Sequence, residues 1–306
     1  MLSKFLDPKN DVAFRKIFGS ERNKDILIHF INDILVFKES APIVDVTFLK
    51  TNQDPEIATK KTSIVDVLCQ DEKGNKYIVE MQVAKEKGFE KRAQYYAAKA
   101  YSNQADIGEQ YENLKEIVFI AISDFIMFKD KPGFKSDHVI LDRNSHEHDL
   151  KDFSFTFLEL PKFKKTKDQL ENITDKWMYF FKACTETSPD DLAKIVGSDA
   201  IMERAYHELD RYYWDEIELR TYEQTEKYEH CYNASIRQAI DEGIEKGKAE
   251  GKAEGKAEGK AEGEQIGIAK EKIEIAKTML QKSMDAQTIA EITGLLIEEI
   301  ESLKTT

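Results

Sequence analysis

The sequence predicts an α/β protein in which helices flank a mixed β-sheet, followed by an all-helical C-terminal region with a long helix. Residues 63–83 contain two β-branched runs around Gly74-Asn75, a pattern typical of a β-hairpin. Residues 116–123 (EIVFIAIS) are almost continuously apolar, which is typical of a strand buried on both faces. Beyond residue 161 the apolar residues recur at helical spacing, and four GKAE repeats fill residues 247–262.

Local patterns predict the other elements of the sheet region. Val12, Phe14 and Ile17 lie at helical spacing before Gly19, which indicates a short first helix. The remaining expected elements are a helix over 22–36, a strand over 43–49, a helix over 92–104, a loop with an edge element over 124–151 and a strand over 153–160. This order of helices and strands predicts a mixed sheet with helices against it.

Changes in composition divide the chain into four expected segments. Residues 1–160 hold the α/β domain, and the basic stretch PKFKKTK separates it from a helical subdomain at 161–240. Residues 241–267 hold the Gly-Lys-Ala-Glu repeat, expected as a helix or spacer. Residues 268–306 are expected to form a helical hairpin that mediates oligomerisation.

The C-terminal tail carries unusual charge patterns. In the GKAE repeat identical residues lie four apart, so like charges are neighbours on a helix, and each glycine costs about 1 kcal/mol relative to alanine. The repeat is either a semi-flexible tether or a glycine stripe for a partner helix, and we favour a soft helical spacer used in self-association. Residues 283–306 have the outline of half a helix-turn-helix, but their five acids and one lysine would be repelled by phosphate. We therefore expect this segment to contact proteins.

Composition excludes several classes of protein. A net charge of −13 over 306 residues argues against non-specific coating of nucleic acid, although it is compatible with a local basic groove. The apolar runs are too short for a membrane span, and the N-terminal residues lack the apolar core of a signal peptide. Cys69, Cys184 and Cys231 are too widely spaced for a disulfide framework or a zinc motif. We expect a cytoplasmic protein.

The alternation of residues in the hairpin predicts its register. The odd positions from Val65 to Cys69 and from Tyr77 to Val83 are all apolar, so they are expected to share one face. A three-residue loop over 72–74, with Gly74 in a left-handed conformation, would pair positions whose numbers sum to 146. Val65 would then pair with Met81, Val67 with Val79 and Cys69 with Tyr77.

The same register places two acids opposite each other on the second face of the hairpin. Asp66 would face Glu80, with Gln82 next along the strand. Like charges at paired positions are destabilising, and a divalent cation would compensate for them. An exposed, solvated sheet face is the alternative, but Leu68 and Ile78 share this face. The pair is therefore a candidate metal site.

Several motifs together resemble a known family. Asp66 on one strand, followed after a turn by Glu80-Met81-Gln82, resembles the PD-(D/E)XK nuclease core. The N-terminal FLDPKNDVAFRKIFG, the helix RAQYYAAKAYSNQ, the GKAE repeat and the closing IAEITGLLIEEI are similar to those of the PD-(D/E)XK family transposases, also called recombination-promoting nucleases. The resemblance covers nearly the whole chain and implies a restriction-endonuclease-like fold.

The resemblance also implies an activity and its residues. It implies Mg²⁺-dependent hydrolysis of DNA phosphodiester bonds, with Mn²⁺ as a substitute, in recombination or transposition. Asp66 and Glu80 would be metal ligands, with the carbonyl of Met81, and Asp66, Glu80 and Gln82 would be catalytic. The superfamily pattern has a lysine at position 82, whereas glutamine carries no charge. Lys60, Lys61 or Lys85 could supply that charge, and the sequence does not distinguish among them.

Two further sets of residues have both functional and structural interpretations. Asp11 is either a third metal ligand or a first-turn acid that stabilises its helix. The basic residues next to the acidic strand either bind DNA or form a solvated helix start: Lys85, Lys87, Lys91 and Arg92. The alternative for the whole chain is a catalytically silent assembly or nucleic-acid-binding protein, and the sequence does not decide between DNA and RNA.

Overall fold

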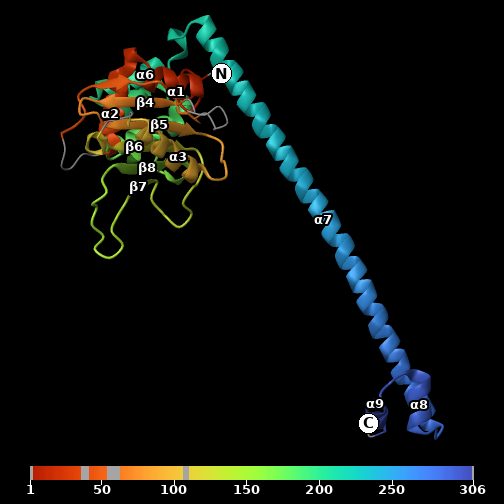
Figure 1. Ribbon diagram of the computed structural model, residues 1–306. Helices are drawn as coiled ribbons and strands as arrows, with labels where there is room; N and C mark the ends of the chain where they lie inside the picture. Colours follow the sequence, from red (N-terminus) through yellow and green to blue (C-terminus); the bar gives the residue numbers. More distant parts are fainter. Residues whose placement is uncertain (1–2, 36–40, 54–62, 106–109, 305–306) are drawn as a thin grey trace. The chain divides into compact units, whose positions relative to one another are not determined.

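A computed structural model describes residues 3–35, 41–53, 63–105 and 110–304 (Figure 1). The chain forms two compact units, Met1–Cys231 and Tyr232–Thr306. None of the described helices combines the length and the apolar character needed to cross a membrane.

A six-stranded mixed sheet forms the centre of the first unit, as predicted (Figure 1). Its strands lie in the order β1-β4-β5-β6-β8-β7, with β5, β6 and β8 parallel and the other neighbours antiparallel. The strands are β1 (Val46–Phe48), β4 (Val67–Asp71), β5 (Lys76–Gln82), β6 (Ile117–Ser123), β7 (Lys135–Val139) and β8 (Phe153–Glu159). A separate ribbon pairs β2 (Asn52–Gln53) with β3 (Ser63–Ile64).

The predicted register of the hairpin is confirmed. Val67 pairs with Val79 and Cys69 with Tyr77, and Gly74 has a φ of +93°. Two expected pairs lie outside the ladder, which begins at Val67: Val65 with Met81 and Asp66 with Glu80. Val65 packs instead in the opposite core, with Leu68 and Ile78. The regular alternation of side chains between the two faces of the sheet is interrupted between β3 and β4. The interruption includes Asp66, the residue directly before β4.

Helices cover both faces of the sheet. Tyr77 and Val79 of β5 pack into the core of one face, whereas Ile78 packs into the other. The first core includes side chains from α1 (Asp11–Phe18), α2 (Lys24–Leu35), α4 (Ile173–Ala183), α5 (Pro189–Val196) and α6 (Ala200–Glu208). The second core includes α3 (Phe89–Ser102), which connects the parallel strands β5 and β6. Strand β6 is buried at every position, as its apolar sequence predicts.

Helices α4, α5 and α6, which follow residue 160, belong to the same core as one face of the sheet. Trp177 and Phe181 of α4 lie 6.0 and 5.7 Å, between ring centroids, from Phe18 of α1. The indole of Trp177 also donates a 2.8 Å hydrogen bond to Asp33 of α2. The boundary expected at residue 160 therefore lies inside one continuous apolar core.

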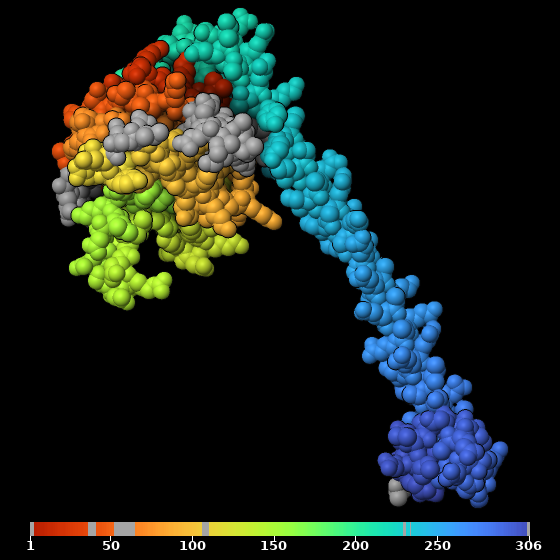
Figure 2. Space-filling view, viewed as in Figure 1, coloured from red at the N-terminus to blue at the C-terminus, as the bar shows by residue number. Residues whose placement is uncertain are grey.

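The second unit consists of three packed helices at the end of the chain. α7 (Glu216–Gln281) ends beside α8 (Ala286–Thr293) and α9 (Ile297–Leu303), and each contributes one side chain to a small core: Ala276, Ile289 and Ile300. Residues 234–271 of α7 are exposed at every position, including all four GKAE copies (Figure 2). The repeat is therefore part of one continuous helix.

Candidate active site

Asp66 and Glu80 meet where β4 begins and β5 approaches its carboxyl end. The backbone N–H of Asp66 donates to Oε2 of Glu80 at 3.1 Å, and the backbone N–H of Met81 donates to Oδ2 of Asp66 at 2.9 Å. Each carboxylate thus accepts a hydrogen bond from the main chain of the opposite strand. Because main-chain donors are rigidly placed, these two bonds hold the acids side by side.

One arginine from each helical layer faces this acid pair. Nη2 of Arg15, on α1, lies 3.3 Å from Oδ1 of Asp66. Nη2 of Arg92, on α3, lies 4.0 Å from Oε1 of Glu80. The side chains of Asp66 and Glu80 are 13% and 8% exposed, whereas that of Arg15 is 51% exposed. The pair is therefore buried between the layers, with cations at its margin.

Burial makes the charged form of both acids unfavourable. Loss of water, followed by the neighbouring Asp66 charge, raises the pKa of Glu80 to about 8. Burial also raises the pKa of Asp66, and the hydrogen bond from Met81 partly opposes this shift. Buried acids in close proximity with raised pKa values are characteristic of functional sites.

Gln82 follows on β5 and contacts Arg92. Its Oε1 accepts a hydrogen bond from Nη2 of Arg92, and its Nε2 donates to the carbonyl of Ala84 at 2.8 Å. Asp66, Glu80 and Gln82, which were predicted as one set, therefore lie together where β4 begins and β5 ends. Arg92 contacts both Glu80 and Gln82.

The other predicted residues lie around this centre or beyond it. Asp11 is exposed in the first turn of α1, and its charge raises the pKa of Asp66. Lys87 and Lys91 are exposed, and Nζ of Lys85 lies 3.4 Å from the carbonyl of Ile126. The two lysines considered as substitutes for a lysine at position 82 lie outside the described residues: Lys60 and Lys61.

Comparison with known families shows which family the chain belongs to. Residues 8–239, well over half of the 306-residue chain, match the model for PD-(D/E)XK nuclease family transposases. The chain belongs to this family. The matched segment includes the acid pair, both arginines and helices α4 to α6. A search of curated proteins and a search of solved structures gave no match.

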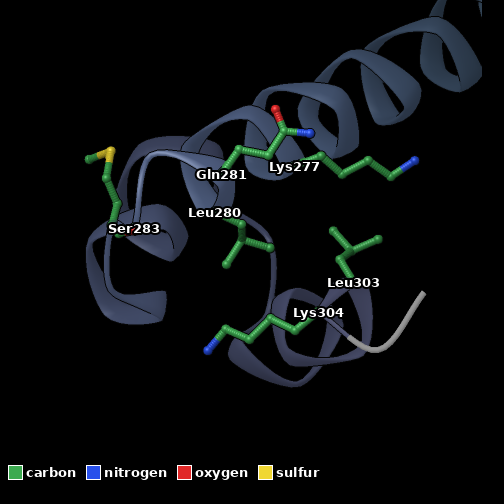
Figure 3. A pocket seen from close by; sticks show the side chains of 7 residues that line it. Lys277, Leu280, Gln281, Ser283, Leu303 and Lys304 are labelled. Carbon is green, nitrogen blue, oxygen red and sulfur yellow. The ribbon is translucent and has the colours of Figure 1, made fainter.

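The tail of this family member matches a second model. Residues 269–305 match the C-terminal HTH domain of the Rpn/YhgA-like nuclease family. This match corrects the expectation of only half a helix-turn-helix. The end of α7 packs with α8 and α9, and a left-handed Gly294 (φ +69°) ends α8 before α9. An open pocket on this domain is lined by Lys277, Leu280, Gln281, Ser283, Met284, Leu303 and Lys304 (Figure 3). A role in protein contacts stays a prediction.

The acid pair fits a divalent cation, which PD-(D/E)XK nucleases generally require. Mg²⁺ is commonly bound by one or two carboxylates, and water and substrate phosphate complete its shell. Asp66 and Glu80 are two such carboxylates, and a cation bound between them would offset the cost of burying their charges, the cost that raises the pKa of Glu80. Among the described residues no group of three or more His, Cys, Asp or Glu side chains is arranged to hold a metal. Within the described ranges, Asp11 therefore does not form a three-carboxylate group with the pair.

Arg15 is the site residue that the sequence analysis did not identify. It lies four residues after Asp11, so the two side chains share one face of α1. Its position could have been noticed in the sequence, because a basic residue four positions after a candidate metal ligand lies on the same face of the helix.

Proposed function

We propose that this chain is a Mg²⁺-dependent endodeoxyribonuclease that hydrolyses DNA phosphodiester bonds and promotes recombination or transposition. The observation that carries the proposal is the reciprocal pairing of Asp66 and Glu80 with main-chain N–H groups in a chain of the nuclease family. Mn²⁺ is expected to substitute for Mg²⁺, because both prefer oxygen ligands.

The roles of the residues follow from their positions. A bound divalent ion would polarise the scissile phosphate and lower the pKa of an attacking water. Asp66 and Glu80 would hold that ion, and the main-chain N–H groups of Asp66 and Met81 keep the two carboxylates oriented toward it. Asp11 would act through a water molecule or the substrate. Gln82, the third residue of the predicted catalytic set, would act through its contact with Arg92.

Basic side chains beside the site are proposed to hold the DNA backbone. Lys85, Lys87 and Lys91 are exposed at the start of α3, next to Arg92. Their local positive charge would offset the net charge of −13 of the whole chain. Replacing all three lysines with methionine should weaken DNA binding and reduce its dependence on salt.

A cleavage assay tests the proposed activity. Purified protein should nick or cut plasmid DNA in Mg²⁺ or Mn²⁺ and not in EDTA. Asp66→Asn and Glu80→Gln should lower the rate by at least about 100-fold, because the ion that would act on the phosphate loses a charged ligand. Glu112→Gln removes an exposed acid elsewhere in the same unit and is the matched control. Wild-type protein that neither cleaves DNA nor binds a divalent ion would refute the proposal.

Self-association through the tail is also proposed, and the charge pattern of α7 favours parallel pairing. On a helix, each GKAE lysine lies about 100° to one side of the preceding glycine, and the glutamate before that glycine lies about 100° to the other side. When two parallel copies pair along their glycine rows, lysines therefore face glutamates on both flanks. Antiparallel copies would place like charges together.

A truncation separates self-association from cleavage. Removing residues 241–306 should lower the mass measured by light scattering to that of a monomer. A nuclease should keep some cleavage after this truncation, whereas the alternative, a catalytically silent assembly protein, would lose its function with its tail. RNA in place of the DNA substrate tests which nucleic acid is cleaved. The cytoplasmic location stays a prediction from the cysteine pattern.

A further inference from the structure

The amide of Gln82 makes one hydrogen bond to the protein at each of its two polar atoms. Arginine has only donors, so the atom of Gln82 that faces Arg92 is the oxygen, and the amide nitrogen then points to the carbonyl of Ala84. The two contacts are consistent with each other and define the orientation of the amide. Gln82 therefore holds the guanidinium of Arg92 through its oxygen and is anchored to the main chain through its nitrogen.

The guanidinium of Arg92 is fixed from several directions. It lies 4.9 Å from the ring centroid of Phe89 and 5.9 Å from that of Tyr96, one turn to either side on α3. Nη1 contacts Glu86 at 2.6 Å, and Nη2 lies 4.0 Å from Glu80. The side chain is 27% exposed, so a substrate can reach it.

We propose that Arg92 is the catalytic cation of this nuclease centre and that Gln82 is its positioning residue. This assignment rests on the proposed nuclease function. The guanidinium lies beside Glu80, where a lysine at position 82 would otherwise supply positive charge. Its fork of donors matches two oxygens of a phosphate, and Glu86 occupies one of those donors until a DNA phosphate replaces it.

The other nearby cations fit this role less well. Arg15 contacts Asp66 from the opposite helical layer and is half exposed. The amino group of Lys85 lies against a loop carbonyl, at 3.4 Å from the oxygen of Ile126. In the part of the chain that the structure describes, Arg92 is the cation with contacts to both Glu80 and Gln82.

Arginine remains protonated under all assay conditions, so Arg92 does not accept a proton from water. Its contribution is the stabilisation of negative charge that develops on the phosphate. A preorganised donor of this kind typically contributes about 100-fold to 1,000-fold to the rate. Gln82 and the two aromatic rings supply that preorganisation.

Cleavage of plasmid DNA by a set of variants tests the assignment. Arg92→Met should lower kcat by about 100-fold or more, and Arg92→Lys should retain part of the rate. Gln82→Met should lower kcat, and adding it to Arg92→Met should cause little further loss, since both act through one guanidinium. Gln82→Lys in the Arg92→Met background should restore part of the rate. Lys73→Met, at the far end of the hairpin, is the charge-matched control.

Mg²⁺ binding in the absence of DNA, measured by calorimetry, separates a catalytic role from a structural one. Removing a cation beside Glu80 should leave Mg²⁺ affinity unchanged or tighter while cleavage falls. A structural role would instead lower Mg²⁺ affinity and Tm together, and Gln82→Lys would restore nothing. If Arg92→Met fails to fold, Arg92→Lys and Gln82→Met provide the same comparison. Wild-type cleavage that Arg92→Met and Gln82→Met leave unchanged overturns this assignment alone, whereas inactive wild-type protein refutes the proposed function and this assignment with it.

Discussion

Replacing Glu80 with glutamine tests the buried acid pair through protein stability, without relying on cleavage. In the folded protein the pKa of Glu80 is raised to about 8, above its ordinary value of 4.5. Between these two pH values the unfolded chain has lost this proton and the folded chain still holds it. Rising pH therefore favours unfolding, and the stability associated with the protonated acid is lost as pH increases through this window.

The size of the effect follows from the shift. Each pH unit within the window costs about 1.4 kcal/mol, so the wild type should lose roughly 3 kcal/mol between pH 4.5 and pH 7 through this group. Glu80→Gln keeps the shape of the side chain and removes its titration. The free energy of unfolding of the variant, relative to wild type, should rise by this amount over the same interval.

Urea denaturation in EDTA at a series of pH values measures this difference. Trp177 and Trp214 both lie in the first unit, so their fluorescence reports its unfolding. Added Mg²⁺ should stabilise the wild type near pH 7 and leave Glu80→Gln almost unchanged, because a ligand that binds only the folded state raises its stability. Wild type and variant with parallel pH profiles between pH 5 and pH 8 would refute the reasoning, and Glu112→Gln is expected to follow the wild type.

Two further substitutions test the fold around the site and the tail. Gly74 has a φ of +93°, so Gly74→Ala should destabilise the first unit by about 1 to 2 kcal/mol in urea denaturation, and Gly74→Asn by less. Equal stability of wild type and Gly74→Ala would contradict the left-handed turn. Ile300→Ala removes a buried side chain from the tail core and should cost it about 2 to 5 kcal/mol. Circular dichroism should then show earlier loss of helix with no change in the tryptophan transition, and a coincident shift of both would contradict separate units.

Alternation along the chain predicted the hairpin correctly because strand pairing is a local property. Once Gly74 closes the turn, the pairs from Val67 to Cys69 follow from period-two packing alone. The exception is Val65. The apolar pattern of the sequence continues through this residue, but the β-strand does not, and its side chain lies on the other face of the sheet. Nothing in a β-branched run marks such a break, because either face of a covered sheet accepts valine.

The helices after residue 160 were harder to place for a different reason. Their apolar faces predicted helices correctly, but an amphipathic face does not specify its partner. Trp177 packs against Phe18 and donates to Asp33, which lie 159 and 144 positions earlier in the chain. A basic linker before such helices is compatible with two arrangements. The helices can form a new domain, or they can pack back onto the core of the preceding α/β domain.

The electrostatics of the site depend on the same kind of distant contact. The sequence of β5 places an uncharged glutamine at position 82, where the superfamily pattern has a lysine. From sequence alone, the expected sources of that positive charge are nearby lysines. The structure places a guanidinium from α3 on that glutamine instead. A glutamine binds and orients an arginine through its oxygen, whereas a lysine at the same position would repel it. Gln82 and Arg92 therefore act as one unit, so Gln82→Lys should lower the rate when Arg92 is present and restore part of it when Arg92 is methionine.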